Sequence, residues 1–149
     1  MADAIVEIVG QDDLPVITEL FNQIYRPAQD IPAFKRRLLG RYNTLQMIAR
    51  VGDRPVGFFL GYELTPSVYF TWHYGVLPDF RKQGIASQLM EAVHEWAQNS
   101  SYDAIRLETP NSSRAMLRLA IAHGYDIVGI RHDSERGDNQ VLFEKSLSG

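Results

Sequence analysis

The stretch that decides the fold, residues 76–86, reads Val-Leu-Pro-Asp-Phe-Arg-Lys-Gln-Gly-Ile-Ala. An aromatic, strand-like run from Tyr69 to Val76 leads into it, and an amphipathic helical pattern follows from Gly84 to Gln98. A strand that turns directly into a helix leaves backbone N–H groups without acceptors at the positive end of the helix dipole. Residues 81–86 therefore predict an anion site that suits a phosphate chain.

Two common phosphate-binding motifs are absent from the sequence. A P-loop needs the pattern G-x-x-x-x-G-K-[ST], and the segment from Arg81 to Ser87 lacks it. The dinucleotide motif G-x-G-x-x-G occurs nowhere in the chain. Hydrolysis of nucleoside triphosphates and Rossmann-type dinucleotide binding are therefore both disfavoured.

Residues 76–86 resemble the V-x-P-x-x-[RQ]-x-x-G-x-[GA] signature of the GCN5-related N-acetyltransferase (GNAT) superfamily. In that family this turn binds the pyrophosphate of acetyl-CoA. Ile105–Glu108 is similar to the family's fifth strand, and His123-Gly124-Tyr125 to the end of its fourth helix. The resemblance implies a single α/β (α+β) domain over residues 1–149, with a mixed, mostly antiparallel sheet of six to seven strands flanked by about four helices.

Periodicity and turn residues predict the individual elements. Strands are expected at Ala4–Val9, Leu45–Val51, Val56–Leu64, Val68–Val76, Ala104–Glu108, Asp126–Arg131 and Val141–Lys145. Helices are expected at Pro15–Tyr25, from Ile31 or Pro32 to Arg41, at Gly84–Gln98, and in a segment that ends at His123. Asp12 or Asp13 is expected to cap the first helix, and Asn111 or Ser112 the last.

The composition limits the chemistry that this chain can perform. It has no cysteine, which excludes disulfides, a thiolate nucleophile and Cys-ligated metals, and no His–carboxylate spacing predicts a metal site. The net charge of −3 and the lack of a long apolar run predict neither a nucleic-acid nor a membrane partner, and we expect a cytoplasmic protein. Residues 26–54 are nevertheless rich in Lys and Arg. This basic segment is either a solvated helix or a rim that attracts anions to a substrate or cofactor cleft.

The resemblance implies acetyl-CoA as co-substrate and assigns residues to it. Backbone groups of Tyr74, Gly75 and Val76 would pair with the pantetheine arm as an added strand does. The pyrophosphate would lie against Arg81, Lys82, Gln83, Gly84, Ile85, Ala86 and Ser87. The small residues at 84 and 86 let the backbone approach phosphate, whereas the two cations could equally be solvated. Ser113 falls where the family usually has a cofactor-contacting Asn.

Acetyl transfer to an amine needs a base for the amine and a proton for the departing thiolate. By resemblance Glu108 occupies the position of a fifth-strand Glu and is our candidate general base. The alternative is a carboxylate that faces solvent or pairs with an Arg such as Arg106 or Arg114. Ala120 stands where many family members have their general-acid Tyr. Tyr125 and Tyr25 are replacement candidates, although a Tyr at 125 is typical of a packed aromatic.

Three histidines have weaker interpretations. His73 lies on the strand expected to border the thioester, where it lines an acceptor site or packs among rings. His94 is expected to face solvent from the polar side of its helix. His123 falls at a helix C-terminus, where positive charge suits the dipole.

These observations predict an acetyl-CoA-dependent N-acetyltransferase that acts on an amine of a small molecule or of a peptide or protein. We expect the acceptor site among Ile24–Ala33, the strand around His73, and the final strand pair. Ala120 and Ser113 favour an alternative, a catalytically weak CoA-binding sensor or interaction module. A homodimer is expected only by analogy, because dimers are common in the family.

Overall fold

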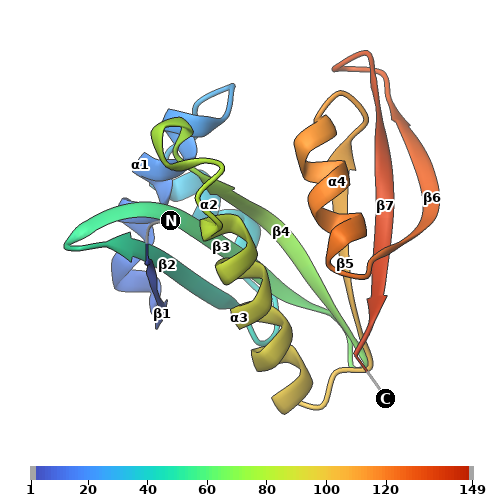
Figure 1. Ribbon diagram of the computed structural model, residues 1–149, viewed down its shortest axis with the longest axis horizontal. Coiled ribbons are helices and arrows are strands. Elements are labelled where there is room, and N and C mark those ends of the chain that lie inside the picture. Colours follow the sequence, from blue (N-terminus) through green and yellow to red (C-terminus); the bar gives the residue numbers. More distant parts are fainter. Residues whose placement is uncertain (1–2, 148–149) are drawn as a thin grey trace. The chain divides into compact units, whose positions relative to one another are not determined.

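A computed structural model describes residues 3–147. Within them the elements are β1 (Ile5–Val9), α1 (Leu14–Ile24), α2 (Ile31–Leu38), β2 (Leu45–Val51), β3 (Arg54–Thr65), β4 (Val68–Val76), α3 (Ile85–Asn99), β5 (Ala104–Pro110), α4 (Arg114–Ala122), β6 (Asp126–Asp133) and β7 (Asp138–Ser146) (Figure 1). Short 3-10 helices cover Gln11–Asp13 and Pro78–Phe80. The strands form a mixed sheet in the order β1-β2-β3-β4-β5-β7-β6, which confirms the expected fold class.

The chain divides into two compact units, and each is described by itself. The first comprises Met1–Glu63 with Trp72–Val93, and the second Leu64–Thr71 with His94–Gly149. The first residues of β4 thus belong to the second unit and its last residues to the first. The expectation of one domain over residues 1–149 stays a prediction.

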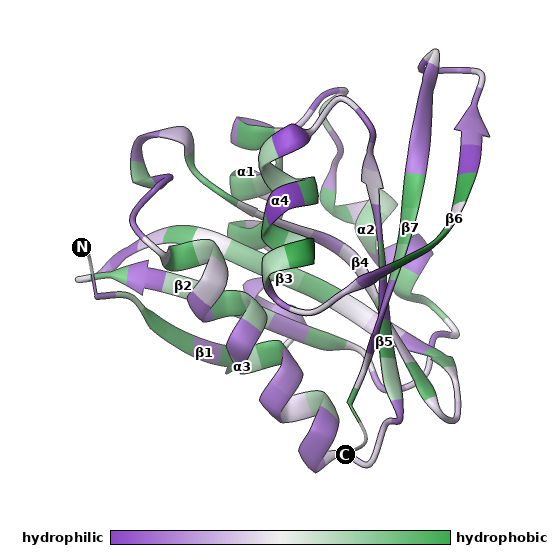
Figure 2. Ribbon diagram, turned by 45° about the vertical axis from the view of Figure 1, so that its right-hand side comes forward, coloured by the Kyte–Doolittle hydropathy of each residue, from purple (hydrophilic) through white to green (hydrophobic). Residues whose placement is uncertain are grey.

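The first unit is built around β3. β1 and β2 pair antiparallel, as do β2 and β3, and Gly52 takes φ +60° in the turn between the latter two. Successive residues of β3 are covered from opposite sides: the Phe58 ring contacts Phe21 of α1, while a Cβ at Gly57 would lie 3.0 Å from Leu89 of α3. β3 is accordingly buried from Val56 to Tyr62, where most of its residues are apolar (Figure 2). Helices on both faces hold the strand that neighbours β4.

The second unit is a sheet of β5, β7 and β6 with the start of β4. β7 pairs antiparallel with both β5 and β6, and Val68–Thr71 of β4 pairs in parallel with Ala104–Leu107 of β5. Tyr69 is fully buried, with its ring centroid 4.9 Å from that of Trp96 and 5.1 Å from that of Tyr102. α4 ends with Gly124 at φ +87°, the left-handed position expected after its last turn.

Of the predicted helix caps, Asp13 lies at the N-cap position of α1 but makes no capping hydrogen bond, and the cap at Asn111 or Ser112 is wrong. Asp13 precedes α1, but its backbone is not extended (φ −94°, ψ 4°), and its side chain makes no capping hydrogen bond. Ser113, not Asn111 or Ser112, precedes α4, also without a capping bond. Asp30, which the sequence analysis missed, is extended, and its Oδ1 accepts the N–H of Ala33 at 2.9 Å. An N-cap side chain reaches the helix amides from such an extended backbone.

Candidate active site

The predicted strand–turn–helix is present in the first unit. β4 ends at Val76, a 3-10 turn spans Pro78–Phe80, and α3 begins at Ile85. Gly84 lies just before α3 at φ +83°, and its carbonyl accepts the N–H of Gln88 at 3.0 Å. The N–H groups of a helix's first turn have no intrahelical acceptor, so their dipoles can face an anion at this end of α3.

Side chains of the loop bond back to its own backbone. Arg81 Nε donates to the Val76 carbonyl at 3.1 Å, and Gln83 Nε2 to the Asp79 carbonyl at 3.4 Å. The Arg54 guanidinium lies over the Phe80 ring, 5.0 Å from its centroid. These bonds hold the loop in shape, and Arg81 places its charge at the end of β4. Cofactor contacts by Arg81, Lys82 and Gln83 stay predictions.

The backbone of β4 near its end is oriented by contacts with β3. The Leu77 N–H donates to the Val56 carbonyl at 2.8 Å, so the planar peptide turns the Val76 carbonyl away from β3. The Gly75 carbonyl instead faces β3, because a Cβ at Gly57 would lie 3.2 Å from that oxygen. Carbonyls alternate along a strand, so Tyr74 and Val76 both present theirs on the edge away from β3.

Tyr25 covers this edge of β4. Its hydroxyl donates a short hydrogen bond to the Tyr74 carbonyl. A Cβ at Gly75 would lie 3.2 Å from the Tyr25 ring and hydroxyl and from Ile24, so glycine is needed for close approach by the end of α1. Burial raises the pKa of Tyr25 to about 12, although the nearby charge of Arg81 acts in the opposite direction. The hydroxyl therefore keeps its proton at neutral pH.

Aromatic side chains gather where α1 and α2 meet β4. The His73 ring lies 4.5 Å from Trp72 and 4.9 Å from Phe21, centroid to centroid, and Phe34 of α2 lies 5.6 Å from Trp72. The Arg37 guanidinium stands over Trp72, 5.3 Å from the ring centroid. Tyr25, from the expected segment Ile24–Ala33, lies 6.3 Å from His73, centroid to centroid, so two of the three segments expected around the acceptor are in contact and His73 packs among rings.

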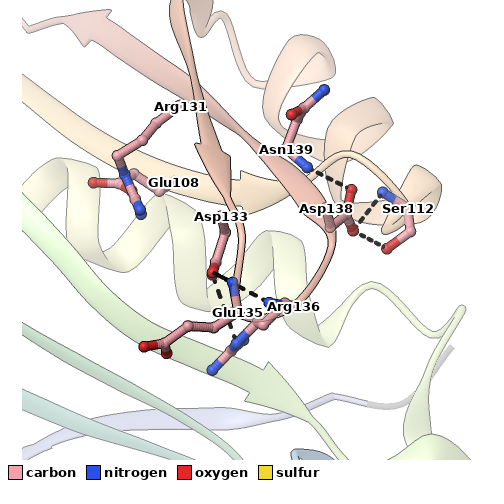
Figure 3. Close-up of polar contacts among 8 residues, drawn as sticks. All are labelled: Glu108, Ser112, Arg131, Asp133, Glu135, Arg136, Asp138 and Asn139. Atoms are coloured by element: carbon pink, nitrogen blue, oxygen red, sulfur yellow. Dashed lines mark hydrogen bonds and ion pairs between the residues drawn. The ribbon is translucent and has the colours of Figure 1, made fainter.

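Glu108 lies in the second unit, on β5. Its Oε1 accepts a hydrogen bond from Arg131 Nη2 of β6 at 2.7 Å, and its side chain is 33% exposed. The two side chains point toward each other (Figure 3). Arg106 pairs instead with Glu144 at 2.7 Å. The alternative of a carboxylate that pairs with an Arg is thus confirmed, although the partner is Arg131 and not Arg106 or Arg114. Glu108 raises the pKa of the Arg131 guanidinium, chiefly through the hydrogen bond between them.

The start of α4 departs from the sequence interpretation. Ser112 donates from its hydroxyl to Asp138 Oδ2 at 2.6 Å, which explains why it does not cap the helix (Figure 3). This bond also lowers the pKa of the Asp138 carboxyl. Ser113 is half-buried, and its cofactor role stays a prediction. Ala120 is fully buried, and its carbonyl accepts the N–H of Tyr125 at 3.0 Å.

His94 is not solvent-facing, contrary to the prediction. Its Nε2 lies 2.8 Å from the hydroxyl oxygen of Tyr125, whose side chain is buried against Phe143. Burial, together with the nearby charges of Lys145 and His123, lowers the pKa of His94 to about 4. Helical periodicity places His94 on the polar face with Glu91 and Gln98. Its hydrogen-bond partner, Tyr125, is nevertheless buried inside the second unit. Packing with His94 is the role the structure favours for Tyr125.

Two features are absent from the described residues 3–147. No helix among them is both long and apolar enough to cross a membrane. No group of three or more His, Cys, Asp or Glu side chains among them is arranged to hold a metal ion.

The sequence matches the model of the acetyltransferase (GNAT) family over residues 14–125. The chain belongs to the GNAT family. It is 27% identical, over 148 aligned residues, to the L-2,4-diaminobutyric acid acetyltransferase of Methylotuvimicrobium alcaliphilum, with 89% of this chain and 83% of that protein covered. Together these findings identify an acyltransferase whose acceptor is an amine.

Known structures share the GNAT fold of this chain. The ribosomal-protein-S18-alanine N-acetyltransferase of Escherichia coli superposes with a TM-score of 0.86 at 15% identity, covering 99% of this chain and 96% of that one. A GNAT family acetyltransferase from Elizabethkingia anophelis, with acetyl-CoA bound, gives a TM-score of 0.76 at 18% identity, covering 96% and 97%. At such identities the likeness shows the fold.

Two residues of this GNAT protein escaped the sequence analysis. Arg131 holds Glu108, and no local pattern links positions 23 apart on different strands. Arg37 stands over Trp72, and here a signal existed: Arg37 follows Phe34 by three positions, which places both on one side of a helix.

Proposed function

We propose that this GNAT protein transfers the acetyl group of acetyl-CoA to an amine of a small molecule or a peptide. The observation that carries the proposal is the turn after β4, where Gly84 at φ +83° leads into the N-terminus of α3. Members of the family bind the pyrophosphate of acetyl-CoA at this turn. A cytoplasmic location belongs to the same proposal.

The first unit supplies the cofactor groups. The pyrophosphate accepts N–H bonds from the start of α3, near residues 84–87, and the pantetheine arm runs along the edge of β4 at Tyr74–Val76. On this edge Tyr25 and Arg81 already donate to the two outward carbonyls. The backbone N–H of Val76 remains on the same edge as its carbonyl, as in any extended strand, and is the donor for a pantetheine carbonyl.

Glu108 is the base in this proposal. Glu108 accepts a proton from the amine as its nitrogen attacks the thioester carbonyl, and the carbon–sulfur bond then breaks. The hydrogen bond from Arg131 fixes the orientation of the carboxylate, which leaves its second oxygen for the amine. The ion pair is thus a positioning contact for the base in this proposal.

The departing thiolate takes a proton, and we assign that donor to Tyr25. Ala120 has no hydroxyl, and the Tyr125 hydroxyl is bonded to His94 in the buried interior. Tyr25 has its hydroxyl on β4, next to the backbone assigned to pantetheine, and keeps its proton at neutral pH. Glu108 then releases its proton to water and the Tyr25 phenolate takes one up from water, so both side chains return to their starting state.

The charge of α2 favours acceptors that carry a carboxylate. Lys35, Arg36 and Arg37 are exposed in its last turns, and Arg37 is held over Trp72 beside His73. A guanidinium held by a ring can bind a carboxylate with two parallel hydrogen bonds. The curated relative acts, by its name, on an amino acid with a side-chain amine. Diamino acids are therefore the first acceptors to test.

The test follows thiol release from acetyl-CoA with a panel of amines: L-2,4-diaminobutyrate, lysine, matched diamines without a carboxylate, and peptides with different N-termini. We expect acceptor-dependent release, faster with the carboxylates than with the matched diamines. Calorimetric binding of CoA without any acceptor-dependent release would favour the sensor alternative, which Ala120 motivates. The absence of CoA binding would refute both.

A further inference from the structure

Two arginines of the first unit stand over neighbouring aromatic rings. The Arg37 guanidinium lies 5.3 Å from the centroid of the Trp72 ring, and that of Arg41 lies 4.5 Å from the centroid of the Tyr62 ring. The two ring centroids are 6.5 Å apart. A ring holds a guanidinium by cation–π attraction and leaves its N–H groups to donate to an anion. The two side chains are therefore a preorganised set of hydrogen-bond donors.

Neither of these charges is neutralised within the described part of the chain. Both arginines are exposed, and no ion pair joins either of them to a carboxylate of residues 3–147. Asp30 is engaged at the far end of α2, where it caps the helix. Glu63 follows Tyr62 directly on β3, so strand alternation places the two on opposite faces. The guanidiniums are thus available to an anionic group from outside.

The dipole of α2 does not account for this pair. Cations in the last turn of a helix complement its dipole, and Lys35 and Arg36 are placed to do so. Arg41 lies beyond the end of the helix at Leu38, after Gly40 at φ +78°. Its guanidinium nevertheless reaches the ring next to the one that holds Arg37. The second charge therefore has a position that helix electrostatics does not require.

We propose that Arg37 and Arg41 form a docking surface for an acidic peptide segment of the acceptor, with two carboxylates that lie two positions apart in an extended chain. Residues i and i+2 of an extended chain project to the same side, roughly 6–7 Å apart, which matches the ring separation of 6.5 Å. Each guanidinium donates two parallel hydrogen bonds to one carboxylate. The acceptor role rests on the proposed function: Trp72 adjoins His73, its ring 4.5 Å away, in the region expected to hold the amine.

Two observations favour a peptide over a small anion or a membrane. A diamino acid has one carboxylate and would use only one of the two guanidiniums. Leu39, between the two arginines in the chain, is 82% exposed, and a free dicarboxylate would leave this apolar surface in water. An anionic lipid surface attracts cations without regard to their spacing, whereas planar guanidiniums held by rings suit carboxylates at a fixed separation.

Fluorescence anisotropy with labelled peptides tests the surface without catalysis. The peptides share one length, a free N-terminus and an amidated C-terminus. They carry two Asp residues two positions apart, two adjacent Asp residues, one Asp and one Asn two positions apart, or two Asn residues. We expect the first peptide to bind the full chain roughly fivefold more tightly than the peptide with one Asp, because each carboxylate then has its own guanidinium. The peptide with adjacent Asp residues should lie between them.

Single variants assign the second carboxylate to the pair of arginines. R37Q and R41Q should each remove the advantage of two carboxylates over one, and R37K and R41K should lose most of it because an ammonium lacks the planar fork. The control R54Q removes another ring-held guanidinium, 5.0 Å from the Phe80 centroid at the other end of β3, and should keep the fivefold ratio. Thermal unfolding checks that each variant is folded. A ratio that R37Q and R41Q leave unchanged would overturn the proposal.

Acetyl transfer to the same peptides separates this proposal from the proposed function. We expect the peptide with Asp residues two positions apart to have a lower KM than the Asn peptide at a similar kcat, and R37Q or R41Q to raise that KM toward the Asn value. Transfer to all the peptides at equal KM would overturn the docking surface and leave the proposed function standing. Binding in the expected order, without transfer to any amine, would overturn the proposed function and with it the acceptor role.

Anionic vesicles provide the competing test. We expect the chain to sediment no more with vesicles of phosphatidylcholine and phosphatidylserine than with phosphatidylcholine alone. Sedimentation with the anionic vesicles that R37Q and R41Q weaken, together with equal affinity for all four peptides, would assign the surface to a membrane and overturn the proposal.

Discussion

The loop in the first unit and Glu108 in the second are built in different ways. Between Val76 and Gly84 the side chains of the loop bond to backbone four or five positions away, as from Arg81 to Val76 and from Gln83 to Asp79. Glu108 is held by Arg131, 23 positions away and on another strand. Adjacent residues specify the loop, whereas sheet pairing brings the acid and its partner together.

A sequence motif can therefore locate the loop, whereas the orientation of the Glu108 side chain depends on the register of the strands. The loop functions through backbone N–H groups, whose directions follow from the turn itself. Glu108 functions through a side chain, whose orientation depends on β6 and β7 aligning correctly: Glu108 and Gly129 both lie opposite Leu142. Substitutions that act on one region and spare the other can therefore test the contrast.

The largest effect is expected from E108Q. The amide cannot accept the proton of the amine, so kcat should fall roughly hundredfold or more, with little change in the affinity for acetyl-CoA. Stopped-flow thiol release and calorimetry measure the two quantities. The control E144Q removes a carboxylate from a similar ion pair, that with Arg106 at 2.7 Å, and should keep its activity. Equal activity of E108Q and wild type would remove Glu108 from the mechanism.

The next largest effect should come from G84V, which acts on the other region. A β-branched residue is strained at φ +83° and brings a side chain toward the phosphate site, so the dissociation constant of acetyl-CoA should rise roughly tenfold or more. The control G137V, at φ +65° in the β6–β7 turn, introduces similar strain away from the loop. If G84V and G137V lose similar thermal stability but only G84V loses affinity for acetyl-CoA, the loop is the phosphate site. An unchanged affinity in G84V would contradict this assignment.

A smaller effect is expected from Y25F, which removes the hydroxyl that bonds the Tyr74 carbonyl. We expect kcat to fall about tenfold, less than is typical for a proton donor because water can substitute in part. Single-turnover rates of acetyl transfer measure this step. Y42F alters a tyrosine that is 71% exposed and serves as the control. If Y25F instead changed only the affinity for CoA, Tyr25 would be a positioning residue of β4 and not the donor.

The smallest effect concerns stability rather than activity. His94 has a pKa of about 4 in the folded protein, below the 6.5 that is usual for an unperturbed histidine. The unfolded chain therefore binds more protons between these values, and stability should fall as pH falls from 6.5 toward 4. After allowance for the partial exposure of His94, we expect the free energy of unfolding to fall by about 1–2 kcal/mol over this pH range.

Denaturant unfolding at several pH values checks this expectation. H94Q cannot titrate, so its stability should vary less over this window than that of wild type. H132Q, which changes an exposed histidine of β6, should keep the wild-type slope. A slope that H94Q leaves unchanged would assign the pH dependence to other groups.

The sequence alone predicted most of the fold. The bounds of β4 were predicted to the residue, and the left-handed Gly124 after α4 was predicted from its place in the chain. These features depend on neighbouring residues, through the side-chain alternation of strands and the freedom of glycine. The caps failed for a related reason: Asp13 has the right side chain, but its local backbone is not extended.

What the sequence by itself determined is the family and the loop from Val76 to Ala86, because strand end, glycine and helix start are consecutive. Tertiary structure alone decided that Glu108 is held by Arg131, that Tyr25 bonds the Tyr74 carbonyl, and that His94 turns inward to Tyr125. Each of these pairs joins residues far apart in the chain. Their hydrogen bonds exist only once strands are in register and helices are packed, and no local pattern encodes that register.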